Sequence, residues 1–564
     1  MQTLYREIIE LLKNKEYEKL ANYPLHRPKE MNWVVDVFEG IHTVNSPNKT
    51  ALLWTDGKET IEYSYQDFTS KTNKLLNFLR NKGVEQGDIL FTQMMLQPIT
   101  WTSILANIKG GFKMIPAASI LGTQDIIYRF QKTFPKVVFA DQENAYKTDE
   151  AEEDIGKKIP VKIIAEGTRD GWYSLKDIEK ENDKAEGVSN KPSDVLFYFF
   201  TSGTTGMPKI VCHTHLSLTI GHLSTTAWIG LNNEDIHYNI SQPGWAKFAW
   251  SSFFAPWNMG ATIFAHHTDA RFHAKTTLEL IEKHKITTLC APPTVLRMFI
   301  KEDLKRHTFS LKECVAAGEP LNPEVIEAWR KGTGITIRDG YGQTESTCLI
   351  GNLSGNNIKY GSMGKPMFMY DAIIADDDGN VMEDYDEGNI CIRMERGEQV
   401  NGIFKGYLFD KEREARGFKH GLYFTGDKAY RDSDGYIWFV GRDDDVIKAS
   451  DYRIGPFEVE SVLLEHPSVT ESAVVASPHP IKGFEVKAFV ILNEGTTPTK
   501  ELANELFTYS REHLAPYKMP RIIEFVEELP KTISGKIRRI ELRANEAENK
   551  AKEVRKEFEF FYRK

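Results

Sequence analysis

The chain has 564 residues, of which 41% are hydrophobic and 27% are charged, and this composition is ordinary for a globular protein. Its length exceeds what a single hydrophobic core usually supports, so we expect at least two domains. The formal net charge of −9 argues against nucleic acid as the main partner.

The cysteines are odd in number and no two of them have a C-x-x-C spacing, which favours reduced thiols over a disulfide framework or a zinc site. They are Cys212, Cys290, Cys314, Cys348 and Cys391. The N-terminus lacks the apolar run of a signal peptide, and no stretch approaches the roughly 18 uninterrupted apolar residues of a spanning helix. We therefore expect a cytoplasmic protein without a membrane span.

The first 140 residues predict alternating helices and strands. Leu4, Ile8, Leu11 and Leu12 fall on one face of an amphipathic helix. Further on, the sequence predicts a strand at 51–54, a helix at 65–81 and a strand at 88–92. This alternation indicates an α/β layout with a largely parallel sheet. The charge-rich segment 149–186 is predicted to lie on the surface, and its first residues, 149–154, are predicted to form a solvent-exposed face.

A stretch rich in glycine and hydroxyl groups lies between a predicted strand at 195–200 and another that begins at 210. Glycine lets backbone N–H groups approach an anion closely, while hydroxyls and an ammonium add donors. The spacing differs from a Walker loop, which needs four residues between its glycines. The alternative is an ordinary turn, but the number of donors favours a phosphate cradle. Its residues are Thr201, Ser202, Gly203, Thr204, Thr205, Gly206 and Lys209.

The segment 242–257 carries three tryptophans and three phenylalanines. A helix packed into the core is the favoured interpretation for most of these side chains. However, Pro243 and Gly244 form a turn directly ahead of Trp245, and such an aromatic residue often walls a pocket.

Two later loops carry side chains that could bind parts of a nucleotide. In the segment 339–346, Tyr341 could stack on a flat ring and Glu345 could bind the cation that accompanies a triphosphate. In the segment 422–427, Asp427 follows a turn glycine and could accept hydrogen bonds from sugar hydroxyls. Each pattern taken alone is equally compatible with an ordinary polar turn.

The charged break after the strand at 437–442 predicts a domain boundary. Beyond it, strands at 474–477 and 488–491 and helices at 458–466 and 500–513 predict a compact α+β unit. Lys536 follows a Ser-Gly turn and could be aimed at an anion from a loop, although a solvated basic patch is the commoner arrangement. From Glu541 the tail is helix-prone and ends in four aromatic residues, to which we assign no function.

These motifs, in this order, resemble those of the adenylate-forming superfamily of acyl-CoA synthetases, adenylation domains and luciferases. The segments 243–247 and 452–458 are most similar to the medium-chain acyl-CoA synthetases. The resemblance implies an α/β fold with a large N-terminal multi-sheet adenylate-forming domain at 1–442. It also implies a small mobile C-terminal α+β domain at 443–564, with a hinge at Asp444.

The resemblance implies a two-step acid–thiol ligation in which a carboxylate attacks ATP and CoA then displaces AMP. Lys536, Lys209 and Glu345 would be catalytic, and Glu345 and Thr204 would bind Mg²⁺. ATP and AMP would be held by the phosphate cradle above and by Gly318, Glu319, Pro320, Asp339, Gly340, Tyr341, Gly342, Gln343, Thr344, Asp427 and Arg442.

CoA would bind a face that enters the site when the C-terminal domain rotates, and its residues would be Ser450, Asp451, Tyr452, Arg453, Lys482 and Lys518. Two of them depart from the family pattern. Asp451 stands where relatives usually have glycine, which adds bulk and charge in the path of pantetheine. Lys482 stands where relatives often have arginine, which removes a bidentate fork.

The acid pocket would be formed by Trp245, Lys247, Phe248 and Gly342. Acetate-specific relatives have tryptophan at the position of Gly342, so the resemblance implies room for a medium-chain, branched or aryl acid of fatty acid metabolism.

The partners would be a small carboxylic acid, ATP and CoA, with either a monomer or a homo-oligomer. The alternative is transfer of the acyl group to the phosphopantetheine of a carrier protein. A nucleotide-binding protein without ligase activity and a P-loop phosphotransferase are disfavoured.

Overall fold

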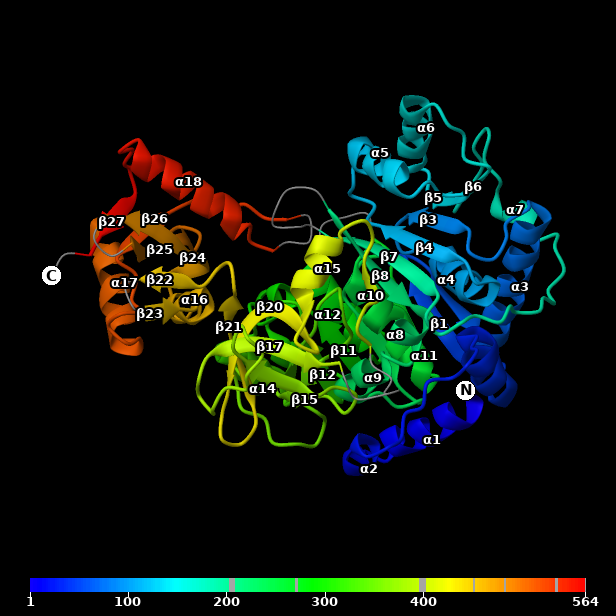
Figure 1. The fold of residues 1–564 in the computed structure, drawn as a ribbon, viewed down its shortest axis with the longest axis horizontal. Coiled ribbons are helices and arrows are strands. Elements are labelled where there is room, and N and C mark those ends of the chain that lie inside the picture. Colours follow the sequence, from blue (N-terminus) through cyan, green and yellow to red (C-terminus); the bar gives the residue numbers. More distant parts are fainter. Residues whose placement is uncertain are drawn as a thin grey trace.

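A computed structural model describes residues 1–201, 208–268, 272–394, 402–449, 452–480, 483–532 and 536–562. Within these ranges the fold is mixed α/β, with a large part built around three sheets and a smaller C-terminal part that has a four-stranded and a two-stranded sheet (Figure 1). The predicted fold class is confirmed. None of the helices in the described ranges combines the length and apolar character needed to cross a bilayer.

The sheet that carries the predicted phosphate cradle is mainly parallel. Its last strands form an antiparallel hairpin in which Thr201 lies opposite Lys209, so the cradle connects two adjacent strands as predicted. In sheet order the strands are β18 (Gly406–Tyr407), β8 (Lys209–Thr214), β7 (Val195–Thr201), β4 (Lys113–Ala117), β3 (Ile89–Gln93), β5 (Val137–Ala140) and β6 (Val161–Ile164).

A second, larger sheet has a parallel centre. The carboxyl ends of parallel strands lie at the same edge of a sheet. The residues predicted to surround adenine lie at this edge, just after β12 and within β13. In sheet order the strands are β15 (Lys365–Pro366), β14 (Ile350–Gly351), β13 (Ile337–Tyr341), β12 (Glu313–Ala316), β11 (Thr288–Ala291), β9 (Ile236–Asn239), β10 (Thr262–His266), β1 (Thr50–Thr55) and β2 (Thr60–Ser64).

The third sheet is antiparallel and supplies the predicted ribose residue. Asp427 lies on one strand directly opposite Arg442 on the next. The strands are β16 (Ala372–Ala375), β17 (Gly388–Arg393), β20 (Leu422–Arg431) and β19 (Phe418–Lys419), with β21 (Ile437–Arg442) paired to β20.

Helices cover these sheets, and their starts follow local capping rules. The predicted helix at 65–81 is found with those bounds, because the Ser64 hydroxyl accepts from the Asp67 N–H while the Asp67 carboxylate accepts from the Ser64 N–H. The predicted N-terminal helix is also confirmed. The helices are α1 (Gln2–Lys13), α2 (Tyr17–Ala21), α3 (Tyr65–Asn81), α4 (Pro98–Gly110), α5 (Thr123–Lys132), α6 (Ala145–Ile155), α7 (Leu175–Ile178), α8 (His215–Thr219), α9 (Leu223–Ile229), α12 (Ala274–Lys283), α13 (Pro293–Phe299), α14 (Pro323–Thr333) and α15 (Lys411–Gly417), with a π-helix η1 (Val34–Thr43) and a 3₁₀-helix η3 (Leu304–Arg306).

The aromatic segment forms a helix with a π-helical centre, from α10 (Ala246–Ala249) through η2 (Trp250–Phe254) to α11 (Ala255–Met259). Most of its rings are buried in the main core, as expected from their bulk. Trp245, at the start, is only partly buried.

The segment 149–186 opens on a face that is solvated at Glu150, Glu153 and Asp154, as predicted, but not at Glu152. Asp149 lies within α6, and Glu152 on the same helix is 1% exposed rather than solvated. Its carboxylate accepts from the Ile159 N–H at 2.5 Å and from Lys162 Nζ at 2.9 Å. These partners neutralise the charge, so the helix packs against the edge of the first sheet.

The C-terminal part confirms the strands and helices predicted for it. Its elements are β22 (Ile447–Ala449), β23 (Tyr452–Ile454), α16 (Pro456–Leu464), β24 (Val469–His479), β25 (Gly483–Leu492), α17 (Lys500–His513), β26 (Ile522–Phe525), α18 (Arg539–Ala551) and β27 (Glu559–Phe561). The aromatic tail forms β27, which pairs with β26. Phe560 and Tyr562 pack on the core of this part, so the tail completes its sheet.

Candidate active site

An ion pair joins the predicted phosphate cradle to the predicted magnesium ligand. Lys209 begins β8, Glu345 lies in the turn after β13, and Lys209 Nζ is 2.5 Å from Glu345 Oε1. The Tyr407 hydroxyl donates to the same oxygen at 2.8 Å, and Lys209 Nζ is 5.2 Å from the centre of the Tyr407 ring. These contacts fix the carboxylate beside the loop that would hold phosphates.

Glu345 is charged in this setting although it is only 5% exposed. Burial alone would raise its pKa, but the charge of Lys209 and the hydrogen bonds from Lys209 and Tyr407 outweigh burial, and the pKa is lowered. A buried carboxylate that stays ionised next to an ammonium suits the binding of a divalent cation together with an anionic substrate.

The rest of the phosphate cradle is described only at its ends. Thr201 closes β7, and its buried hydroxyl has no hydrogen-bond partner within the described part of the chain, which fits an anion donor that acts when substrate is bound. Ser202, Gly203, Thr204, Thr205 and Gly206 lie outside the described residues.

Asp427 is the centre of a second network. Its Oδ2 accepts from the Tyr341 hydroxyl and from Gln343 Nε2, each at 2.6 Å. Gln343 Nε2 also donates to the Thr425 carbonyl at 3.0 Å, and the Tyr423 hydroxyl donates to Gln343 Oε1 at 3.3 Å. The structure thus brings together Tyr341, Gln343 and Asp427, three of the predicted nucleotide residues.

Burial is the main electrostatic effect on Asp427 and raises its pKa. The Tyr341 hydrogen bond, the Arg442 guanidinium and, more weakly, Gln343 and Lys536 act in the opposite direction. A partly desolvated carboxylate is a strong hydrogen-bond acceptor, so it is suited to a pair of vicinal sugar hydroxyls.

The predicted adenine residues gather where β12 and β13 end. Ala316 on β12 lies opposite Asp339 on β13, so the loop that contains Gly318, Glu319 and Pro320 begins beside the segment 339–341. Gly318 has a φ of 107°, and a Cβ there would meet no atom within 4 Å. Open space beside this glycine fits a flat ring approaching the backbone.

Two lysines, Lys247 and Lys536, complete the site. Lys247 Nζ donates to the Ala317 carbonyl at 3.1 Å. Its pKa is lowered, first by desolvation and in smaller part by the charge of Lys536. The charge of Lys536, which comes from the C-terminal part, thus contributes weakly to lowering the pKa of both Lys247 and Asp427, and its role at the nucleotide stays a prediction.

A narrow cavity lies beside the site and has a mainly apolar lining. Trp245 and Phe248, two residues predicted for the acid pocket, belong to its wall. The other lining residues are Thr92, Thr100, Ser103, Ile104, Met114, Pro116, Phe197, Phe199, Pro243, Gly244 and Ala249.

Gly342 does not leave the empty space that the sequence suggested. A Cβ at this position would lie 2.3 Å from the Thr347 carbonyl oxygen and 2.5 Å from Trp250 Cη2. The ring of Trp250, from η2, thus takes the room beside the glycine.

The described CoA candidates share one surface of the C-terminal part. The Tyr452 ring stacks on Tyr517 with centroids 4.3 Å apart, and Lys518 Nζ is 2.6 Å from Glu458. Ser450, Asp451 and Lys482 lie outside the described residues. Near the predicted hinge, Asp444 Oδ1 is 3.6 Å from Arg442 Nε.

Sequence reasoning missed two residues that hold the Glu345 loop. Tyr407 lies on the edge strand β18, which pairs with β8, nearly 200 residues after Lys209. His213 Nε2 is 2.6 Å from the Thr344 carbonyl oxygen, and burial lowers the pKa of His213 to about 4, so the neutral ring donates this bond. His213 is separated from Lys209 by three residues, and only that proximity could have indicated it.

Comparison with known proteins identifies the family. Residues 42–408 match the AMP-binding enzyme model, and residues 458–536 match the AMP-binding enzyme C-terminal domain. The chain belongs to the AMP-binding enzyme family. The superfamily inferred from the motifs is therefore confirmed.

Relatives within the AMP-binding enzyme family include CoA ligases. The 4-hydroxybutyrate–CoA ligase 1 of Metallosphaera sedula is 45% identical over 529 residues, covering 93% of this chain and 92% of the relative. The mitochondrial acyl-coenzyme A synthetase ACSM3 of Mus musculus is 39% identical over 545 residues, covering 94% and 93%. A solved anthranilate CoA ligase in complex with anthranoyl-AMP has a TM-score of 0.81 at 29% identity, covering 94% and 99%.

Proposed function

We propose that the chain is an AMP-forming acyl-CoA synthetase, an acid–thiol ligase that converts a carboxylic acid, ATP and CoA to acyl-CoA, AMP and pyrophosphate. The observation that carries the proposal is the buried network in which Asp427 Oδ2 accepts from the Tyr341 hydroxyl and from Gln343 Nε2, each at 2.6 Å, together with the Lys209–Glu345 ion pair. Lys209, at the start of β8, and Glu345, in the turn after β13, form that ion pair at the predicted phosphate cradle.

In the first step the acid carboxylate attacks the α-phosphorus of ATP, the P–O bond to pyrophosphate breaks, and an acyl-adenylate forms. The attacking carboxylate and the phosphate are both anionic, so positioned cations should account for most of the rate enhancement. Lys536 would lie between carboxylate and α-phosphate, Lys209 would hold the departing pyrophosphate, and Asp427 would accept from the ribose hydroxyls.

Mg²⁺ is part of the proposal, and the donor set fits it. Glu345 offers an ionised oxygen ligand, and hard oxygen ligands are those that Mg²⁺ prefers. A bound cation would supply charge neutralisation for the triphosphate. Thr204 would be a further contact, although it lies outside the described residues.

In the second step the CoA thiolate attacks the acyl carbonyl carbon and AMP departs. We propose that the domain boundary falls between Arg442 and Asp443 and that the small domain, 443–564, turns about Asp444 between the steps. Two observations support this boundary: β21 ends at Arg442 in a sheet of the large part, and β22 begins at Ile447 in the small part. Tyr452, Arg453 and Lys518 would then form the CoA path.

For the acid we propose a medium-chain, branched or aryl substrate rather than acetate. The support is the apolar character of the lining that includes Trp245 and Phe248, since each buried CH₂ contributes about 0.8 kcal/mol. The cavity itself has room for about one water molecule, so the side chains around it would move apart to admit the acid. The 45% identity to a 4-hydroxybutyrate–CoA ligase favours a short hydroxy acid as the second candidate. The Trp250 ring beside Gly342 would limit the size of either.

The test is AMP release with a panel of acids, measured with and without CoA. The panel contains acetate, 4-hydroxybutyrate, hexanoate, 2-methylbutyrate, benzoate and anthranilate. We expect CoA-dependent AMP release with kcat/KM highest for an acid larger than acetate. Acetate as the best substrate would refute the acid assignment. Acid-dependent pyrophosphate exchange without CoA-stimulated turnover would favour transfer to a carrier protein, and no exchange with any acid would refute ligase function.

The compartment remains a prediction. All five cysteines lie in the described part of the chain, buried and without a disulfide, which fits a reducing compartment. We keep the cytoplasm as the proposal, while the name of the ACSM3 relative places that protein in mitochondria.

A further inference from the structure

The helix that follows the catalytic-lysine loop is attached to the rest of the C-terminal part mainly by charge. The buried residues of α18 are Leu542 and Glu546, so the helix has little apolar surface in the core. Arg539, Arg543 and Glu546 lie four and three residues apart and therefore share one face. Each makes an ion pair with a different element.

The N-terminal half of this face holds the segment just after the proposed hinge. Arg539 Nη2 donates to both carboxylate oxygens of Glu460 on α16, to Oε1 at 2.8 Å and to Oε2 at 2.7 Å. Arg543 Nη1 donates to Asp445 Oδ1, and Arg539 Nη1 lies 3.9 Å from Asp445 Oδ2. The two arginines thus join the start of α18 to the residue that follows Asp444.

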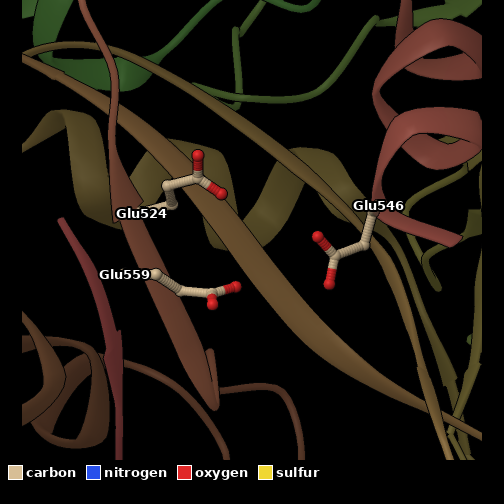
Figure 2. A group of neighbouring side chains, drawn as sticks. All are labelled: Glu524, Glu546 and Glu559. Carbon is tan, nitrogen blue, oxygen red and sulfur yellow. The ribbon is translucent and has the colours of Figure 1, made fainter. Parts of the chain in front are cut away.

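The C-terminal half of the face is anchored by a buried lysine. Lys487 on β25 is 1% exposed, and its ammonium is 2.5 Å from Glu546, 2.7 Å from Glu524 on β26 and 2.6 Å from Glu559 on β27. Figure 2 shows the three glutamates converging from different elements. Lys487 supplies the cation that this carboxylate cluster needs, so the cluster is a junction between α18 and the sheet.

The position of Lys536 depends on how α18 is attached, because only a short segment joins this lysine to the helix. Lys536 precedes α18 by three residues, its backbone N–H donates to the Thr532 hydroxyl at 3.1 Å, and its carbonyl accepts from the Thr532 N–H at 2.7 Å. The Arg538 N–H donates to the Pro530 carbonyl at 2.8 Å. Figure 1 shows the chain before α18 extending from the small part toward the large part.

We propose that the ionic face of α18 positions Lys536 for adenylate formation, with Arg543 and Lys487 as positioning residues. The proposal rests on the function proposed above. If α18 shifts, the lysine shifts with it, and a displacement of about 1 Å at a reacting centre costs roughly 100-fold in rate. Thioester formation does not use Lys536 in the proposed mechanism, so it should tolerate the same shift.

The test compares the two half-reactions in Arg543→Gln and Lys487→Met of the full chain. We expect kcat for acid-dependent ATP–pyrophosphate exchange to fall about 10- to 100-fold, with KM for ATP changed less than threefold. Thioester formation from supplied acyl-AMP and CoA should stay within twofold of the unsubstituted protein. The matched control is Lys552→Gln, because the Lys552–Glu548 pair lies on the exposed side of the same helix and should affect neither step.

A charge swap tests the contact itself. Arg543→Asp combined with Asp445→Arg should regain at least part of the exchange activity lost in each single variant. Equal loss of both half-reactions in Arg543→Gln, or loss of neither, would refute positioning by α18. Absence of exchange in the unsubstituted protein would instead refute the ligase function on which the proposal rests.

Discussion

The Tyr407→Phe substitution tests the arrangement around Glu345. It removes a single hydroxyl, which donates to Glu345 Oε1 at 2.8 Å, and keeps the ring that lies 5.2 Å from Lys209 Nζ. The packing of the site is therefore retained while the carboxylate loses one donor. The pKa of Glu345, now lowered, should move up toward its usual value.

The expected magnitude follows from the charge on the acceptor. A hydrogen bond to a charged group contributes about 1.5–3 kcal/mol, which is roughly 10- to 150-fold in a binding or rate constant. Lys209 remains bound to the same oxygen and keeps Glu345 ionised near pH 7. The loss should thus lie near the lower limit, about 10-fold in kcat/KM for MgATP.

The assay is ATP–pyrophosphate exchange as a function of Mg²⁺ concentration. We expect Tyr407→Phe to raise the Mg²⁺ concentration for half-maximal exchange. The matched control is Tyr436→Phe, since the buried Tyr436 hydroxyl donates to the Asn357 carbonyl at 2.6 Å away from the site. If both variants behave like the unsubstituted protein, Tyr407 does not support the function of Glu345 and the reasoning is wrong.

Three further predictions address the lysine, the acid pocket and acid stability. Lys536→Ala should abolish pyrophosphate exchange but spare thioester formation from supplied acyl-AMP, as measured by separate assays of the two steps. Gly342→Ala should lower the free energy of unfolding by about 1–3 kcal/mol and weaken acid binding, because the new Cβ would displace Trp250. Urea titration measures the loss of stability, and KM for the acid measures the weaker binding. Burial lowers the pKa of His213 to about 4 and of His237 to about 3, so the unfolded chain takes up protons that the folded chain does not as pH falls from 6.5 toward 4. Stability should decline in that window by up to about 1.4 kcal/mol per pH unit for each histidine, as urea titrations at pH 7, 6 and 5 would measure.

Each of these has a contrary outcome. Equal loss of both steps in Lys536→Ala would remove that lysine from its assigned role. An unchanged KM in Gly342→Ala would show that Trp250 does not border the acid. A His237→Asn variant with the same pH slope as the unsubstituted protein would show that His237 is not the source of the dependence.

The sequence determined the features that depend on neighbours along the chain. The helix at 65–81 was predicted with its observed bounds, and the capping box at its start involves residues only three positions apart. Lys209, Glu345 and Asp427 were predicted because each lies in a short motif that can be read along the chain, and the order of these motifs resembles that of a known superfamily. The solvated face predicted at Glu152 failed because its neutralising partner Lys162 comes from a neighbouring strand.

Only the tertiary structure decided which distant residues complete these motifs. Tyr407 reaches Glu345 because β18 adds to the edge of β8, and Trp250, from η2, fills the space beside Gly342. Lys487 draws three glutamates from separate elements into one junction, which no local pattern indicates. Hydrogen bonds and packing across sheet edges depend on the three-dimensional approach of segments far apart in the chain, and that approach is a property of the whole fold.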